Sequence, residues 1–233
     1  MRTENNDLPT LWLYEEVLLV ALRDDKGTVH WGIMHSTVLG GAILADLFMV
    51  GRIGLDETKR KPRVAVLNPT PTGNELVDEC LQRIVDSKRL RKPEDWVMKF
   101  SNTKKLDDRA AQGLVELGAL RREEGKVLFV FPSRRYPEAD PTLEGAVLSR
   151  VGDAIFGVKP VEDPRTATLV SLLSAGDMLK IAFDKKQLKA RKDRVKEIVS
   201  GDASGAAVKA AIEAVNAAII AAVVASTAAA SAG

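Results

Sequence analysis

The sequence predicts a mainly α-helical fold, a compact helical domain with short β-hairpins that include one protruding hydrophobic hairpin. Apolar residues recur at helical spacing in most segments of the chain. A helix end, a glycine and an apolar residue that enters a strand occur twice, at residues 47–53 and at residues 114–120. Each unit continues into a charged turn and a second strand, which is the local pattern of a winged helix.

The helices are predicted in the order in which their patterns occur. Residues 15–22 have apolar side chains at helical spacing, and residues 38–50 are apolar nearly all round, which predicts a buried helix that stops at Gly51. Residues 167–183 are expected at the centre of the core, and residues 187–199 form a basic amphipathic pattern. The other predicted helices cover residues 74–85, 93–100 and 143–156, and a further one ends near residue 117.

Short strands are predicted between these helices. They cover residues 28–33, 53–55, 64–67, 120–122 and 126–131. The turn of the last hairpin is placed at Glu123-Glu124-Gly125, because a glycine follows two charged residues there. The protruding hairpin is therefore expected near residues 120–131.

Composition sets the broad class of the protein. Of 233 residues, 45% are hydrophobic and 28% are charged, and the net charge is only +2, which does not argue for nucleic-acid binding. Residues 1–10 are expected to be a flexible N-terminus, residues 11–227 one domain and residues 228–233 a frayed Ala-rich tail. Cys80 is the only cysteine, which fits a reducing compartment, and the polar residues 1–6 do not resemble a signal peptide.

Five motifs occur in a fixed order along residues 11–227. They are the segment of residues 11–24, Trp31 through Gly51-Arg52, Pro71-Thr72-Gly73 with residues 77–81, residues 114–120, and Asp163-Pro164-Arg165. In their order and spacing they resemble the Golgi phosphoprotein three family of phosphoinositide-binding peripheral membrane adaptors. The Ala-rich composition is more typical of a bacterial member.

The resemblance implies a mostly helical fold, no enzymatic activity and no cofactor. Eukaryotic members of that family bind phosphatidylinositol 4-phosphate on Golgi membranes and hold the cytosolic tails of glycosyltransferases. The expected partners are therefore anionic membrane lipids and the cytosolic tails of membrane proteins, with no nucleic acid. The expected location is cytoplasmic and peripheral to a membrane.

The family's head-group pocket consists of one tryptophan and three arginines, which supply charge-assisted donors to a phosphate. Trp31 matches the tryptophan, while the arginine positions fall on Gly40, Lys104 and Asp107. The residues that can serve as the lipid head-group site are Trp31, Lys104, Lys105, Arg109 and Arg63. Because two arginine positions are lost, we expect a response to total negative charge, and arginine restored at both positions is expected to sharpen specificity.

The hairpin supplies an apolar run beside basic residues, which suits insertion into an anionic membrane surface. The predicted membrane-hairpin residues are Leu128, Phe129, Val130, Phe131, Arg134 and Arg135. The hairpin can also serve as a homo-oligomer interface. The structural alternative is that alternate residues pack inward and the arginines only solvate a strand edge.

Two other classes of function were weighed. The repeated helix and wing favour a winged-helix nucleic-acid binder, but no helix carries a dense basic face. His30 and His35 are the only histidines, no second group of ligands lies nearby, and no metal site is predicted. Both histidines are expected at the surface or at a helix cap, so an enzyme is the weakest hypothesis.

Overall fold

The computed structural model describes residues 8–22, 33–56, 58, 61–127 and 131–202. The helices are α1 (Leu13–Ala21), α2 (Ile33–Met49), α3 (Glu75–Val85), α4 (Pro93–Ser101), α5 (Leu106–Glu116), α6 (Thr142–Phe156), α7 (Pro164–Ala175), α8 (Leu179–Ala182), α9 (Lys185–Ala190) and α10 (Lys192–Val199). The strands are β1 (Ile53–Asp56), β2 (Arg63–Val66), β3 (Glu123–Val127) and β4 (Phe131–Arg135). The predicted mainly α-helical class is confirmed.

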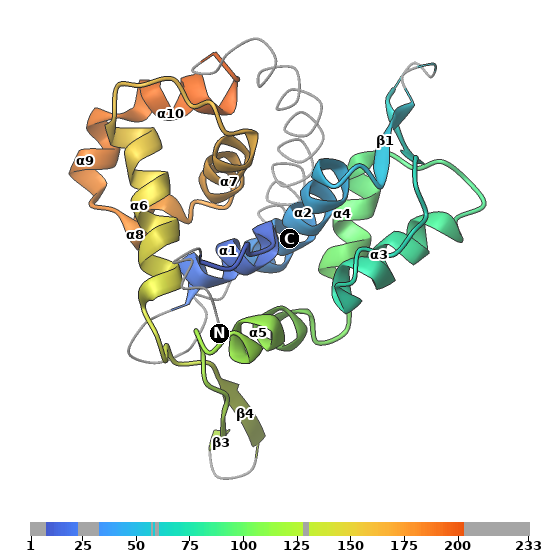
Figure 1. Cartoon of the computed structure of the whole chain (residues 1–233), viewed down its shortest axis with the longest axis horizontal. Helices are drawn as coiled ribbons and strands as arrows, with labels where there is room; N and C mark the ends of the chain where they lie inside the picture. Colours follow the sequence, from blue (N-terminus) through green and yellow to red (C-terminus); the bar gives the residue numbers. More distant parts are fainter. Residues whose placement is uncertain (1–7, 23–32, 57, 59–60, 128–130, 203–233) are drawn as a thin grey trace, which may run out of the picture.

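Two apolar helices form the centre of the molecule. Figure 1 shows α1 and α2 in the middle, α3 and α4 on one side, α6 to α10 on the other, and α5 beneath them. Most of the described side chains of α2 are buried, as the apolar pattern predicted. The β3–β4 hairpin projects from the α5 side of this arrangement (Figure 1).

The repeated helix ends have the same backbone geometry. Gly51 and Gly118 have positive φ angles of 67° and 77°, which glycine adopts without steric cost. The amide of the residue after each glycine donates to the carbonyl oxygen of Leu47 or Leu114, at 2.9 Å and 3.0 Å. These are Schellman motifs, and they turn the chain out of α2 and α5 into the strands.

The second hairpin is shifted relative to the prediction. The turn was expected at Glu123-Glu124-Gly125, but these residues lie within β3, and only residues 128–130 connect the strands. In the antiparallel register Glu123 is opposite Arg135 and Glu124 is opposite Arg134. A register that places glutamates opposite arginines is a favourable one, and Gly125 lies within the strand instead of in a turn.

Two further expectations are corrected. The predicted helix over residues 187–199 is divided into α9 and α10 at Arg191, whose side chain donates to the carbonyl oxygen of Phe156 at 2.5 Å. His35 is buried, with 2% of its surface exposed, rather than at the surface. Cys80 is a buried core residue, and burial raises the pKa of its thiol to about 12.

A buried ionic network joins α1 to α7. Arg165 Nε donates to Glu16 Oε1 at 3.2 Å, its guanidinium also bonds to the carbonyl of Leu11, and it lies 3.8 Å from Asp46 Oδ1. Asp46, on α2, accepts hydrogen bonds from the amides of Leu13 and Tyr14 at 3.0 Å and 3.4 Å. Asp46 therefore caps the N-terminus of α1 from a neighbouring helix.

The Asp46 carboxyl is 1% exposed, and its burial has a consequence for pH. Burial raises the pKa of Asp46 from 3.8 to about 7, although the Leu13 hydrogen bond and the charge of Arg165 lower it. Because the folded chain holds this proton more tightly, Asp46 contributes most to stability below about pH 4. Its contribution falls as the pH rises through about 7.

The Pro-Thr-Gly motif also serves the fold. Asp78 Oδ1 accepts hydrogen bonds from the amide and the hydroxyl of Thr72, each at 2.6 Å. Asn74 caps α3 by accepting from the Val77 amide at 3.0 Å, and its Nδ2 donates to Tyr14 Oη at 2.8 Å. The motif therefore fixes the start of α3 against α1.

Candidate membrane-binding face

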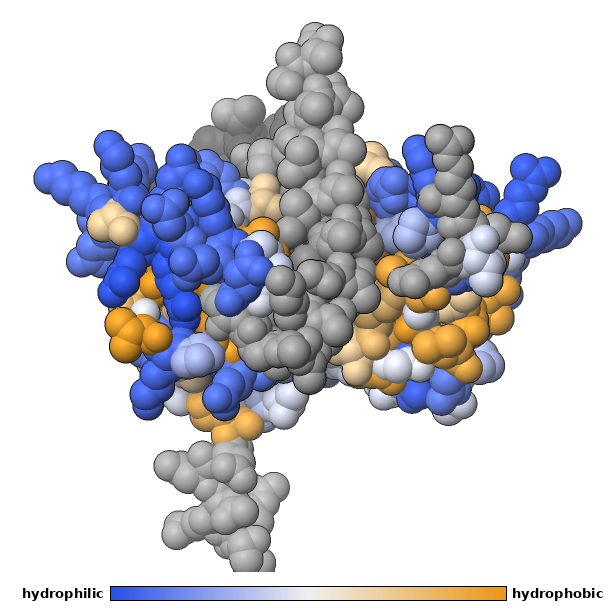
Figure 2. All heavy atoms as spheres, turned by 90° about the horizontal axis from the view of Figure 1, so that it is seen from above, coloured by the Kyte–Doolittle hydropathy of each residue, from blue (hydrophilic) through white to orange (hydrophobic). Residues whose placement is uncertain are grey.

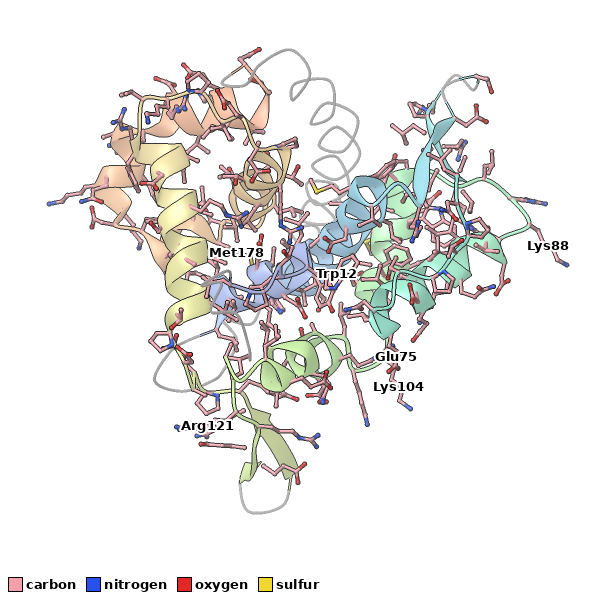
Figure 3. All side chains as sticks on the ribbon, in the orientation of Figure 1. Trp12, Glu75, Lys88, Lys104, Arg121 and Met178 are labelled. Carbon is pink, nitrogen blue, oxygen red and sulfur yellow. The ribbon has the colours of Figure 1, made fainter. Side chains whose placement is uncertain are left out.

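Two exposed lysines precede α5. Lys105 is the N-cap of α5 and has a positive φ of 56°, which is uncommon for a residue with a side chain. Among the described residues, neither Lys104 nor Lys105 has a carboxylate within ion-pair distance. Figure 3 shows the Lys104 side chain on the same side of the molecule as Arg121, where the β3–β4 hairpin projects. We call this side, with Lys104, Lys105 and the hairpin, the α5–hairpin face.

The Arg109 side chain forms ion pairs with two acidic residues of α3. Its Nη1 lies 2.5 Å from Glu79 Oε2, and its Nη2 lies 3.5 Å from Glu75 Oε1. Burial raises the pKa of Glu79, but the hydrogen bond and charge of Arg109 outweigh this, so the pKa lies below its ordinary value. Arg109 thus contributes to the packing of α5 on α3 and is not a free donor for a phosphate.

The structure does not bring Arg63 to the two lysines. Arg63 begins β2 and is opposite Asp56 in the β1–β2 register. Figure 1 places β1 and β2 on the opposite side of the molecule from β3 and β4. Trp31, the remaining predicted head-group residue, lies outside the described residues.

Two of the three positions at which the resemblance implies arginine, Gly40 and Asp107, have structural roles here. A Cβ atom at Gly40 would lie 2.6 Å from Val97 O and 2.9 Å from Ser101 N, because α2 and α4 cross there. Asp107 Oδ1 lies 3.0 Å from Nε2 of the buried His35. An arginine at position 40 would therefore have to displace α4, which argues against the expectation that arginine at both positions sharpens specificity.

The pairing of His35 with Asp107 was missed by sequence reasoning. His35 lies near the start of α2 and Asp107 in the first turn of α5, and neither segment carries a pattern that points to the other. A histidine inside an otherwise apolar helix was the one available signal, because a buried imidazole needs a polar partner. The contact links the first turn of α5, close to Lys105, to α2.

The stem of the hairpin carries charges of both signs. Arg121 Nε lies 3.3 Å from Glu123 Oε1, and Arg122 Nη2 lies 2.5 Å from Glu124 Oε1. Arg135 is exposed. The apolar tip predicted at Leu128, Phe129 and Val130 lies outside the described residues, as do the side chains of Phe131 and Arg134. In the sequence, residues 121–135 hold five basic and two acidic residues, so the hairpin is basic as a whole.

Comparisons with known proteins place the chain in a family. None of the described helices is both long enough and apolar enough to span a bilayer. Vacuolar protein sorting-associated protein 74 of Eremothecium gossypii is 32% identical over 166 residues, which cover 64% of this chain and 50% of that protein. The protein of the same name from Schizosaccharomyces pombe is 31% identical over 166 residues, 64% of this chain and 49% of the relative. This chain thus spans about half the length of these relatives. The family model for Golgi phosphoprotein 3 (GPP34) matches residues 13–215, and the chain therefore belongs to that family.

Proposed function

We propose that this chain is a peripheral membrane adaptor, rather than an enzyme, that binds an anionic membrane surface through the α5–hairpin face. The observation that carries the proposal is that Lys104 lies on the same side of the molecule as the hairpin (Figure 3). Two segments that are separate in the sequence thus present positive charge in one direction. Membership of the Golgi phosphoprotein 3 family supports a role at a membrane.

The α5–hairpin face is better suited to bind negative charge in general than to recognise one particular lipid head group. Exposed lysines near an anionic leaflet contribute about 1 kcal/mol each, and an apolar hairpin tip adds insertion energy. A tight grip on a phosphomonoester needs several arginine forks, and here Gly40 and Asp107 stand where the family has arginine. Binding is therefore expected to follow surface charge density and to weaken with salt.

Other partners follow from the same placement. The cytosolic tails of membrane proteins are proposed clients, since an adaptor at the cytoplasmic surface lies within their reach. The hairpin is also proposed as a contact between copies of the chain. A nucleic-acid function is less well supported, because α5, which precedes the wing, has Asp107 and Asp108 in its first turn.

The electrostatic part is tested with Lys104→Ala combined with Lys105→Ala. Losing two cations at about 1 kcal/mol each should lower partitioning onto phosphatidylserine vesicles about thirtyfold at low salt. The measurement is co-sedimentation over a series of vesicle concentrations. Lys186→Ala with Lys189→Ala, on α9, is the matched control with the same charge loss and should bind like the parent. Equal losses in both double variants would show that the face has no special role.

The hairpin is tested with Phe129→Ala combined with Phe131→Ala. Removing two aromatic rings from the apolar run should lower binding to anionic vesicles while leaving thermal unfolding unchanged. Co-sedimentation equal to that of the parent would exclude insertion of the hairpin. A parent affinity about tenfold higher for phosphatidylinositol 4-phosphate than for charge-matched phosphatidylserine would instead contradict charge-driven binding.

A further inference from the structure

A second basic site lies on another part of the molecule. A pocket of about 890 Å³, here named the α3–α4 pocket, is formed by the end of α3, the α3–α4 loop and α4. Its basic lining residues are Arg83, Lys88, Arg89, Arg91 and Lys99. Figure 3 shows Lys88 at the outer edge of the molecule, away from Arg121 and Lys104, and Figure 2 shows hydrophilic side chains extending from that edge. The Lys88 edge of the pocket therefore lies apart from Lys104 and the hairpin, while Asn102, two residues before Lys104, lines its other end.

The positive charge of this pocket is largely uncompensated. Arg83 is the exception, because its guanidinium bonds to Glu79 and lies 3.0 Å from Thr103 Oγ1. Asp86, the acidic residue of the lining, accepts a hydrogen bond from Gln82 at 2.8 Å. Within the part of the chain that the structure describes, the other four basic side chains have no carboxylate within ion-pair distance; they are Lys88, Arg89, Arg91 and Lys99.

The pocket also borders a buried donor. Trp96 lines it, and the residue is only 2% exposed. Its indole Nε1 is buried and has no hydrogen-bond partner among the described residues. Buried donors are rarely left unpaired in folded proteins, so this indole marks a place next to the pocket where an acceptor is missing.

We propose that the α3–α4 pocket binds a soluble small molecule that carries a phosphate or pyrophosphate group. Arginine and lysine are the side chains that hold phosphate oxygens through charge-assisted hydrogen bonds. Ligand pockets commonly measure about 300–1,000 Å³, so this one has room for an organic group beside the phosphate. Because its Lys88 edge lies away from the hairpin, a molecule in solution can enter the pocket from that edge while the α5–hairpin face is on a membrane.

The test is isothermal titration of the full chain with inorganic pyrophosphate at constant ionic strength. Arg89→Ala removes a cation from the loop and Lys99→Ala removes one from α4, and both residues are exposed, so the fold should be retained. Each change should lower the affinity for pyrophosphate about tenfold or more. The α9 control, Lys186→Ala with Lys189→Ala, loses as much charge as Arg89→Ala combined with Lys99→Ala, and its affinity for pyrophosphate should remain within roughly twofold of that of the parent.

Several results would overturn the proposal. One is a parent that does not bind pyrophosphate, and another is a control pair that weakens binding as much as Arg89→Ala with Lys99→Ala does. A third is tighter binding of a single-stranded oligonucleotide than of pyrophosphate to the parent, if the same variants also lose the oligonucleotide. The site would then bind nucleic acid. A fourth is loss of binding to vesicles with phosphatidylinositol 4-phosphate while pyrophosphate affinity is unchanged, which would assign the residues to a membrane surface. Arg91→Lys keeps the charge but loses the paired guanidinium donors. If the fold is intact, its affinity for pyrophosphate should lie between the affinities of the parent and of the alanine variants.

Discussion

The crossing of α2 and α4 at Gly40 gives a prediction that separates helix propensity from packing. Replacing glycine with alanine inside a helix gains about 1 kcal/mol of stability where the side chain has room. At Gly145, in α6, an added Cβ atom meets nothing within 4 Å, so Gly145→Ala should raise the free energy of unfolding by about that amount. At Gly40 the same atom would lie 2.6 Å from the carbonyl oxygen of Val97.

The overlap at Gly40 involves backbone atoms, which cannot rotate away as a side chain does. Overpacking of a core costs about 1–3 kcal/mol, and separating two helices belongs to the upper part of this range. Gly40→Ala should therefore lower the free energy of unfolding by about 1–2 kcal/mol in spite of the gain in propensity. For a chain of this size 1 kcal/mol corresponds to about 2–4 °C, so the two variants should differ by at least about 4 °C.

Thermal unfolding followed by circular dichroism measures both variants against the parent. If Gly40→Ala melts at or above the temperature of the parent, the close approach of α2 and α4 is not as described. The larger Gly40→Arg change should prevent the crossing altogether and should not create a phosphate site. Specificity in this chain therefore has to come from groups outside that position.

Three more outcomes are expected. Asp46→Asn should gain stability relative to the parent as the pH rises from about 5 to 8, because only the parent must ionise a buried carboxyl with a pKa of about 7. Urea titrations of the parent, of Asp46→Asn and of the control Asp193→Asn over this pH range measure the effect. Asp163→Ala should cost about 1–2 kcal/mol in the same titrations, since Asp163 caps α7 through the amides of Arg165 and Thr166. Vesicle binding should fall steadily with added salt in co-sedimentation, and binding that is independent of salt would exclude a charge-driven surface.

Much of the fold could be predicted because its signals are local. Gly51 and Gly118 each follow a helix with apolar residues in its last turns, and both have the left-handed geometry that stops a helix. The apolar character of α2 likewise predicted its burial. The position of the second hairpin was missed because Gly125 was given more weight than the register that places Glu123 opposite Arg135.

The candidate site was harder to predict, because it depends on contacts between distant segments. The sequence shows that Arg109 is basic, but only the structure shows that Glu75 and Glu79 already hold it. Arg63 is basic too, yet the β1–β2 hairpin takes it to the other side of the molecule (Figure 1). Lys104 and Lys105 remain candidates because they are exposed, a property that a pattern of charges does not give.

The bond between Arg165 and the first helix has a consequence for how the chain is made. Arg165 and Leu11 are 154 positions apart, and Arg165 and Glu16 are 149 apart. During synthesis, at about 5–20 residues per second, the first helix leaves the ribosome long before Arg165 exists, and also before Arg150, which pairs with Glu16 at 2.8 Å. Until then, Glu16 and Asp46 have to remain hydrated or protonated, because an unpaired buried carboxylate is costly. We therefore expect the helical core to close late, when α7 arrives, and nascent chains that stop before residue 165 to remain open to proteases.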